Sequence, residues 1–148
     1  MNIFNTTSTN LVKLAALVWF AGVFILLYKS TAMMIEAVGV GAPLSMVALT
    51  VISGLIVGMI KAKTLFIHVC QKNINRILGL KSPRIWQFYR VRFFIFLFLM
   101  ITLGNYAYHL SSSNAFLLLA LSTLELSVST ALFISGKCFK KVLIKKQI

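Results

Sequence analysis

The sequence predicts an all-α polytopic membrane protein whose four transmembrane helices form one bundle. Its 148 residues are 59% hydrophobic and only 11% charged, which lies outside the range of soluble globular domains. Four apolar segments approach the roughly 20 residues that a helix needs to cross about 30 Å of hydrocarbon. Thirteen of the fifteen lysines and arginines follow the second and fourth segments, in two blocks, as expected of cytoplasmic loops and tails.

The expected spans are residues 11–28, 42–60, 93–110 and 114–135. They leave too little sequence for a soluble domain, so residues 1–148 are predicted to be a single integral membrane domain. A cytoplasmic connection over residues 61–92 joins spans two and three, and a basic tail covers residues 137–148.

The charge distribution predicts orientation and partners. A net charge of +13 would suggest nucleic acid for a soluble protein, but basic residues beside membrane spans indicate contact with the bilayer and its anionic phospholipid headgroups, and no nucleic acid. With both basic blocks in the cytoplasm, both termini are cytoplasmic too. The outer segments then carry only Lys29 and Glu36, in the first loop.

The first span could instead be a signal peptide cleaved near Ser30-Thr31-Ala32. We favour a retained anchor, because the apolar run ends at Tyr28, directly against that site.

The connection between spans two and three begins with an amphipathic pattern over residues 61–80. Its apolar positions recur at helical spacing: Ala62, Phe66, Cys70, Ile74, Ile77 and Leu78. Such a helix either lies flat on the inner leaflet or continues the second span as one rod ending at Gly79. We expect the next helix to start before the membrane, with Ser82 as its cap and Pro83 in its first turn.

Basic residues of this connection are candidates for binding lipid headgroups or a partner's acidic face: Lys72, Arg76, Arg84, Arg90 and Arg92. The last three alternate with aromatic residues, which is typical of an interfacial anchor. Arginine also suits bidentate contact with phosphate.

Glu125 is the one acidic residue expected inside the hydrocarbon, near the middle of the fourth span. A charge at that depth costs about 3 kcal/mol on insertion scales, so the residue should face protein or water, and the neutral acid is expected unless a cation is close. Ser122 and Ser129 share its helix face. Trp19 and Thr102 lie at similar depth, and we expect the indole of Trp19 to donate a hydrogen bond to Glu125. The role is either structural, holding helices together, or functional, exchanging a proton or cation.

The second span carries a small-residue face made of Thr50, Gly54 and Gly58. This pattern lets another helix approach closely, within the bundle or between copies of the chain.

Catalytic and cofactor motifs are not evident, so the sequence predicts neither an enzyme nor a cofactor. His68, Cys70 and Cys138 fall short of a zinc ligand set, so no metal is expected.

The stretch Cys70-x-Lys72-Asn73-x-x-Arg76-Ile77, with Pro83-x-x-Trp86-Gln87-Phe88 and Arg92-Phe93-Phe94, resembles short four-span bacterial inner-membrane proteins without an assigned activity. The resemblance implies the bacterial plasma membrane and supplies no site residues. The chain is also similar to small multidrug-resistance exporters in having four short spans and one membrane glutamate, but here the glutamate is in the last span.

The sequence thus favours a membrane protein that acts by association, as a homo-oligomer or as a subunit with a membrane-protein partner. The alternative is a small proton- or cation-linked transporter that uses Glu125.

Overall fold

A computed structural model describes residues 7–88 and 91–145, with side chains described for residues 7–87, 95 and 98–145. The elements in order are α1 (Ser8–Gly39), α2 (Leu44–Lys61), the π-helical segment η1 (Ala62–Phe66), α3 (Ile67–Leu78), the 3-10 turn η2 (Ile85–Phe88), α4 (Val91–Ser111), α5 (Ala115–Ser135) and α6 (Lys137–Lys145). The described residues contain no β-strand, so the all-α prediction is confirmed. Three helical stretches are long and apolar enough to cross a membrane: Ser8–Gly39, Leu44–Leu78 and Ala115–Lys145.

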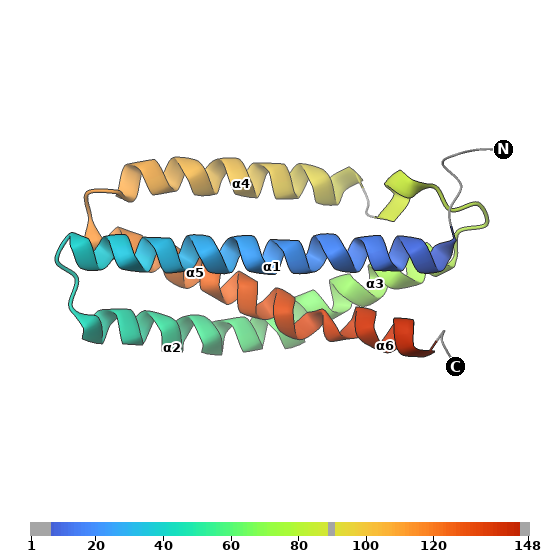
Figure 1. The fold of residues 1–148 in the computed structure, drawn as a ribbon, viewed down its shortest axis with the longest axis horizontal. Coiled ribbons are helices and arrows are strands. Elements are labelled where there is room, and N and C mark those ends of the chain that lie inside the picture. The colour runs from blue at the N-terminus through green and yellow to red at the C-terminus, as the bar shows by residue number, and fades with distance from the viewer. Residues whose placement is uncertain (1–6, 89–90, 146–148) are drawn as a thin grey trace.

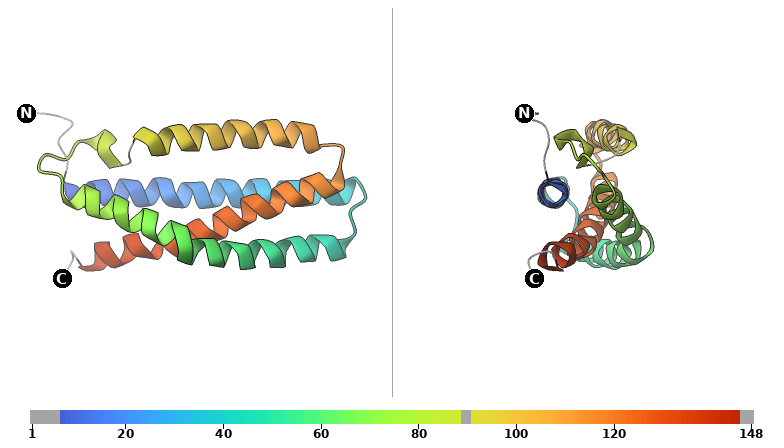
Figure 2. Two further views of the ribbon diagram at one scale, coloured as in Figure 1. Left: turned by 180° about the vertical axis from the view of Figure 1, so that it is seen from behind. Right: turned by 90° about the vertical axis from the view of Figure 1, so that its right-hand side faces the viewer.

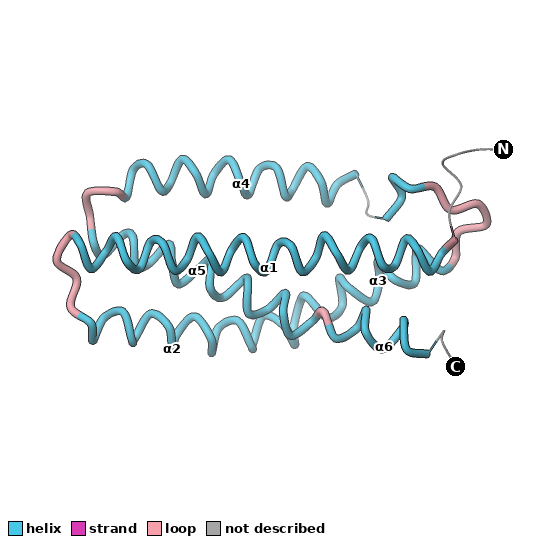
Figure 3. The backbone as a smooth tube through the Cα atoms, in the orientation of Figure 1, coloured by secondary structure: helices cyan, strands magenta, loops and turns pink. Residues whose placement is uncertain are grey.

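The long helices α1, α2, α4 and α5 lie lengthwise beside one another (Figure 1). Helix α5 packs against both α1 and α2, whereas α4 packs mainly against α5 and lies to one side in the end-on view of Figure 2. One end of the bundle, here called the turn end, holds the two short connections, 40–43 and 112–114. The other, here called the basic end, holds α3, η2 and α6 (Figure 3).

The short connections at the turn end depend on local chemistry. Gly41 has a φ of +107°, which a residue with a side chain rarely adopts. Asn114 caps α5 by accepting hydrogen bonds from the backbone nitrogens of Phe116 at 3.0 Å and Leu117 at 3.4 Å. These residues allow the chain to reverse direction within a few positions.

Helix α3 continues α2 through the π-helical segment, so the three segments form one rod from Leu44 to Leu78. The rod changes direction at this segment (Figures 1 and 2), as π-bulges commonly cause. Cys70, Ile74 and Ile77 of α3 are buried in a core formed with α1 and α6. The apolar face is therefore covered by protein. Leu78 was expected on the same apolar face, but it lies at the end of the helix and is 39% exposed.

Helix α1 extends to Gly39, well beyond the expected first span. Lys29 and Glu36 therefore lie within a helix, and their assignment to a loop was wrong. No glycine or proline occurs between Tyr28 and Gly39, so nothing in the backbone stops the helix there.

The prediction of a helix start at Ser82-Pro83 is also wrong, because these two residues are not helical and the turn η2 begins at Ile85; the next helix in the described part of the chain is α4, from Val91. The side chain of Gln87 accepts from the Arg84 backbone nitrogen at 3.0 Å, and the Gln87 nitrogen donates to the Arg84 carbonyl at 3.0 Å. These reciprocal bonds complete a single turn.

Candidate functional site

A series of polar contacts joins α1 to α5, and it places Glu125 in the bundle. The hydroxyls of Ser30 and Ser122 lie 3.0 Å apart, and Ser129 donates to the Val23 carbonyl at 3.0 Å. Both α5 serines are fully buried. Hydrogen bonds of this kind hold helices together where lipid offers no competing partner. The expected stripe of Ser122, Glu125 and Ser129 therefore faces α1.

Within this interface Glu125 forms an ion pair with Lys29. The Nζ of Lys29 lies 3.7 Å from Glu125 Oε1, and the side chains are 28% and 9% exposed, respectively. The same Nζ donates to Asn105 Oδ1 on α4 at 3.1 Å. The other carboxylate oxygen, Glu125 Oε2, is buried and makes no hydrogen bond within the described part of the chain.

Gly104 of α4 lies beside this pair. A β-carbon there would be 3.7 Å from Glu125 Oε1 and 3.9 Å from Lys29 Nζ, which is ordinary van der Waals contact. Three helices therefore surround the charges: α1 supplies the ammonium, α5 the carboxylate, and α4 the amide of Asn105 and the backbone at Gly104.

The site lies at the middle of the bundle. Glu125 is at the centre of the 21-residue helix α5. Lys29 is about 15 Å from Gly39 at 1.5 Å per residue. This central position follows from the antiparallel alignment of α1 with α5. Ser30 lies beside Ser122 and Trp19 lies beside Leu132, so the C-terminal half of α1 lies beside most of α5.

The expected hydrogen bond from Trp19 to Glu125 is wrong. The indole Nε1 donates to the Leu132 carbonyl at 2.8 Å, and the ring packs edge-on against Phe66 and Phe139 in the core of the basic end. The antiparallel register places Trp19 about two helical turns away from Glu125. Thr102 is exposed and donates to the Phe98 carbonyl of its own helix at 2.9 Å, so it does not join the site either.

The small-residue face of α2 packs against α5 of the same chain. A β-carbon on Gly54 would lie 2.9 Å from Leu126 Cδ2, and one on Gly58 would lie 2.7 Å from the Ser127 carbonyl oxygen. Thr50 is 6% exposed and bonds to the Met46 carbonyl of α2. Of the two uses expected for this face, the structure shows the one within the bundle.

The basic residues assigned to lipid headgroups have different surroundings. Arg76 donates to the Gln87 carbonyl, so it fastens α3 to η2. Arg84 is exposed, with its guanidinium 5.6 Å from the centre of the Trp86 ring, and Lys72 is exposed. Arg90 and the side chain of Arg92 lie outside the described residues.

Lys29 and Asn105 were missed as site residues, because Lys29 looked like the end of a span. The uninterrupted helical sequence after Tyr28 was the available indication that this lysine stays in the bundle.

Comparisons with known protein families, with curated proteins and with solved structures found no significant match. The residues that the structure describes contain no group of three or more histidine, cysteine, aspartate or glutamate side chains placed to hold a metal ion.

Proposed function

We propose that this chain is a multi-pass protein of the bacterial inner membrane, in which α1, α2, α4 and α5 are the four spans and the basic end faces the cytoplasm. Three of these helices lie within stretches that are long and apolar enough, and the 21 residues of α4 run beside them. Large apolar side chains are exposed along the bundle, among them Phe24, Leu49, Phe98 and Phe133. Lipid tails are the natural surroundings for such a surface.

For its activity, we propose a small proton- or cation-linked transporter in which Lys29 and Glu125 form the exchanging site. The observation that carries this proposal is the ion pair itself, since the carboxylate has a second titratable group beside it. The Glu125 carboxylate can be neutralised by the Lys29 ammonium, by a proton, or by a metal cation. Occupation by one releases another, which is the elementary step of exchange.

Three features of the site support an exchanging role. Glu125 Oε2 makes no hydrogen bond within the described residues, so one carboxylate oxygen is available to a proton or cation. Lys29 is partly exposed and has Asn105 as a second partner, so its ammonium can keep a hydrogen bond to Asn105 after it separates from the Glu125 carboxylate. Helix α4, which closes the site, packs less extensively than α1, α2 or α5.

The second candidate is association with another copy or with a membrane-protein partner, without catalysis. Helix α4 favours it, because most of its described side chains are exposed, including Leu103, Tyr106 and Leu110. The Gly54 and Gly58 face does not support this candidate, since α5 covers it.

Flux measurements test the transporter proposal. The purified protein is reconstituted into liposomes holding a pH-sensitive dye, and the internal pH is followed after sodium or potassium is added outside. Wild-type protein is expected to move protons in response, and Glu125→Gln is expected to abolish the movement. Glu36→Gln is the matched control, because it removes the other acidic side chain of the chain at the turn end.

Flux that persists in Glu125→Gln would overturn the assignment of the site. No flux from wild-type protein under either cation, together with a stable heteromeric mass in gentle detergent, would favour association instead.

A further inference from the structure

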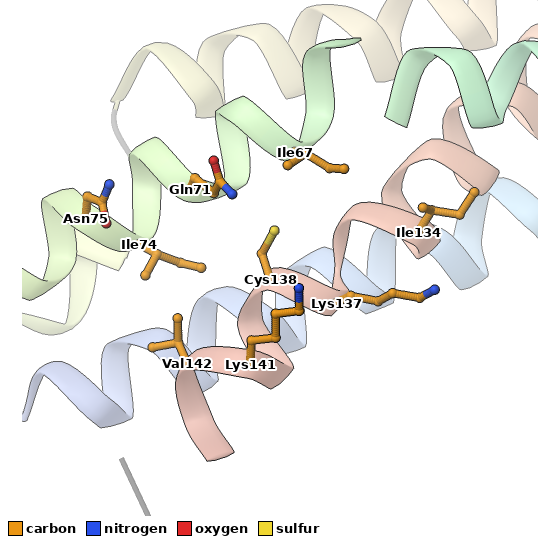
Figure 4. A pocket seen from close by; sticks show the side chains of 9 residues that line it. All are labelled: Ile67, Gln71, Ile74, Asn75, Ile134, Lys137, Cys138, Lys141 and Val142. Carbon is orange, nitrogen blue, oxygen red and sulfur yellow. The ribbon is translucent and has the colours of Figure 1, made fainter. Parts of the chain in front are cut away.

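A pocket of about 310 Å³ opens between α3 and α6 at the basic end. Figure 4 shows Ile74 on the α3 side, and Cys138 and Lys141 on the α6 side, with the gap between the two helices. Its lining includes Ile67, Gln71, Asn75, Ile134, Lys137 and Lys141. None of them belongs to the Lys29 and Glu125 site.

The two lysines of the pocket favour an anionic ligand. Lys137 and Lys141 are four positions apart, so they lie on the same face of α6. Both acidic side chains of the sequence are engaged elsewhere: Glu36 accepts from Tyr108 Oη at 2.6 Å, and Glu125 pairs with Lys29. Charge complementarity therefore favours a negatively charged ligand.

The lining of the pocket suits an amphiphile. Going from the middle of the bundle toward the basic end, α3 presents Ile67, Gln71, Ile74 and Asn75, while the α5 to α6 segment presents Ile134, Lys137, Cys138, Lys141 and Val142. The first position on each side is apolar, and amide or ammonium groups then alternate with apolar side chains. A ligand with an anionic group and an apolar tail meets both kinds of side chain in this pocket.

We propose that this pocket binds the phosphate of an anionic phospholipid, with Lys137 and Lys141 as cationic contacts and the amides of Gln71 and Asn75 as further donors. The first part of the acyl chain lies against Ile67 and Ile134. Ammonium and amide N–H groups are suitable donors to phosphate oxygens, and basic pockets between helices on the cytoplasmic side are used for lipid headgroups.

Native mass spectrometry of the protein in neutral detergent tests the proposal, with phosphatidylglycerol and phosphatidylcholine of the same acyl chains as probes. The pocket variant is Lys137→Gln with Lys141→Gln. The matched control is Lys140→Gln with Lys145→Gln, which removes the same charge from exposed positions of the same helix outside the pocket. Because all four lysines are exposed, both variants should fold, which their thermal unfolding checks.

Wild-type protein is expected to bind phosphatidylglycerol in preference to phosphatidylcholine. The pocket variant is expected to lose roughly tenfold or more in affinity, and the control much less. Equal losses in the two variants would overturn the pocket and indicate a diffuse basic surface. A third arm adds inorganic phosphate: if phosphate alone displaces the lipid at equal concentration, the lipid assignment is overturned and the ligand is a free phosphate compound.

Discussion

A β-carbon added to Gly58 would lie 2.7 Å from the backbone carbonyl oxygen of Ser127, so α2 and α5 approach each other there almost backbone to backbone. Because a carbonyl cannot turn aside as a side chain can, Gly58→Ala is expected to lower the free energy of unfolding by about 1–3 kcal/mol. Gly54→Ala should cost less, since its nearest obstacle is the side chain of Leu126. Thermal unfolding in detergent measures both changes.

Gly39→Ala is the control for this pair, because a β-carbon there meets nothing within 4 Å. A Gly58→Ala protein that keeps its stability but changes its oligomeric mass would contradict the prediction. It would indicate that the small-residue face of α2 forms a contact between copies of the chain.

The second prediction concerns coupling between Lys29 and Glu125. Either Lys29→Gln or Glu125→Gln removes one member of the pair, and each should destabilise the bundle because the remaining group loses its partner. The double variant should be more stable than the sum of the two losses predicts, with a coupling free energy of about 0.5–3 kcal/mol. A double-mutant cycle from thermal unfolding in one detergent measures the coupling. Strictly additive losses would mean that the two charges act independently.

The third prediction uses thiol reactivity to test the packing of α3. Burial, together with the neighbouring Cys138, raises the pKa of the Cys70 thiol, and the thiolate is the reactive form. At pH 8 a maleimide should therefore label Cys138, which is partly exposed, well before the fully buried Cys70. Mass spectrometry of Cys70→Ser and Cys138→Ser proteins separates the two rates. Similar rates would show that α3 lies loosely on the membrane surface.

The fourth prediction concerns orientation. In a protein lacking both native cysteines, Ser113→Cys places a thiol in the exposed turn before α5. A membrane-impermeant maleimide should label it in spheroplasts of the expression host, whereas Cys138 in a Cys70→Ser protein should react only after the membrane is permeabilised. The reverse pattern would place the basic end outside and contradict the orientation predicted from charge.

The sequence predicted the helices well, because a backbone in lipid must bond within its own segment and long apolar runs therefore mark helices. It also predicted that Cys70, Ile74 and Ile77 share one face of a helix, since their spacing repeats with the helical period, and the structure buries that face in protein. The partners of Trp19 and Glu125 could not be predicted in the same way. They depend on the antiparallel register of α1 against α5, which is set by packing over the whole interface.

Lys29 shows most clearly where hydropathy fails to predict the role of a residue. A lysine after an apolar run is normally the end of a span, and its role here follows only from Glu125 and Asn105 lying on two other helices. A lone charge near the end of a run can equally be one half of a pair whose other half lies far away in the sequence.

The pairing of α1 with α5 has a consequence for the order of assembly. Ribosomes make the chain from its N-terminus, so α1 is complete before the sequence that separates it from α5 has been synthesised. Until then Lys29 has neither Glu125 nor Asn105 beside it, and Ser30 has no Ser122. The interface between α1 and α5 can therefore form only after α5 has been synthesised, which makes closure of the bundle a late step.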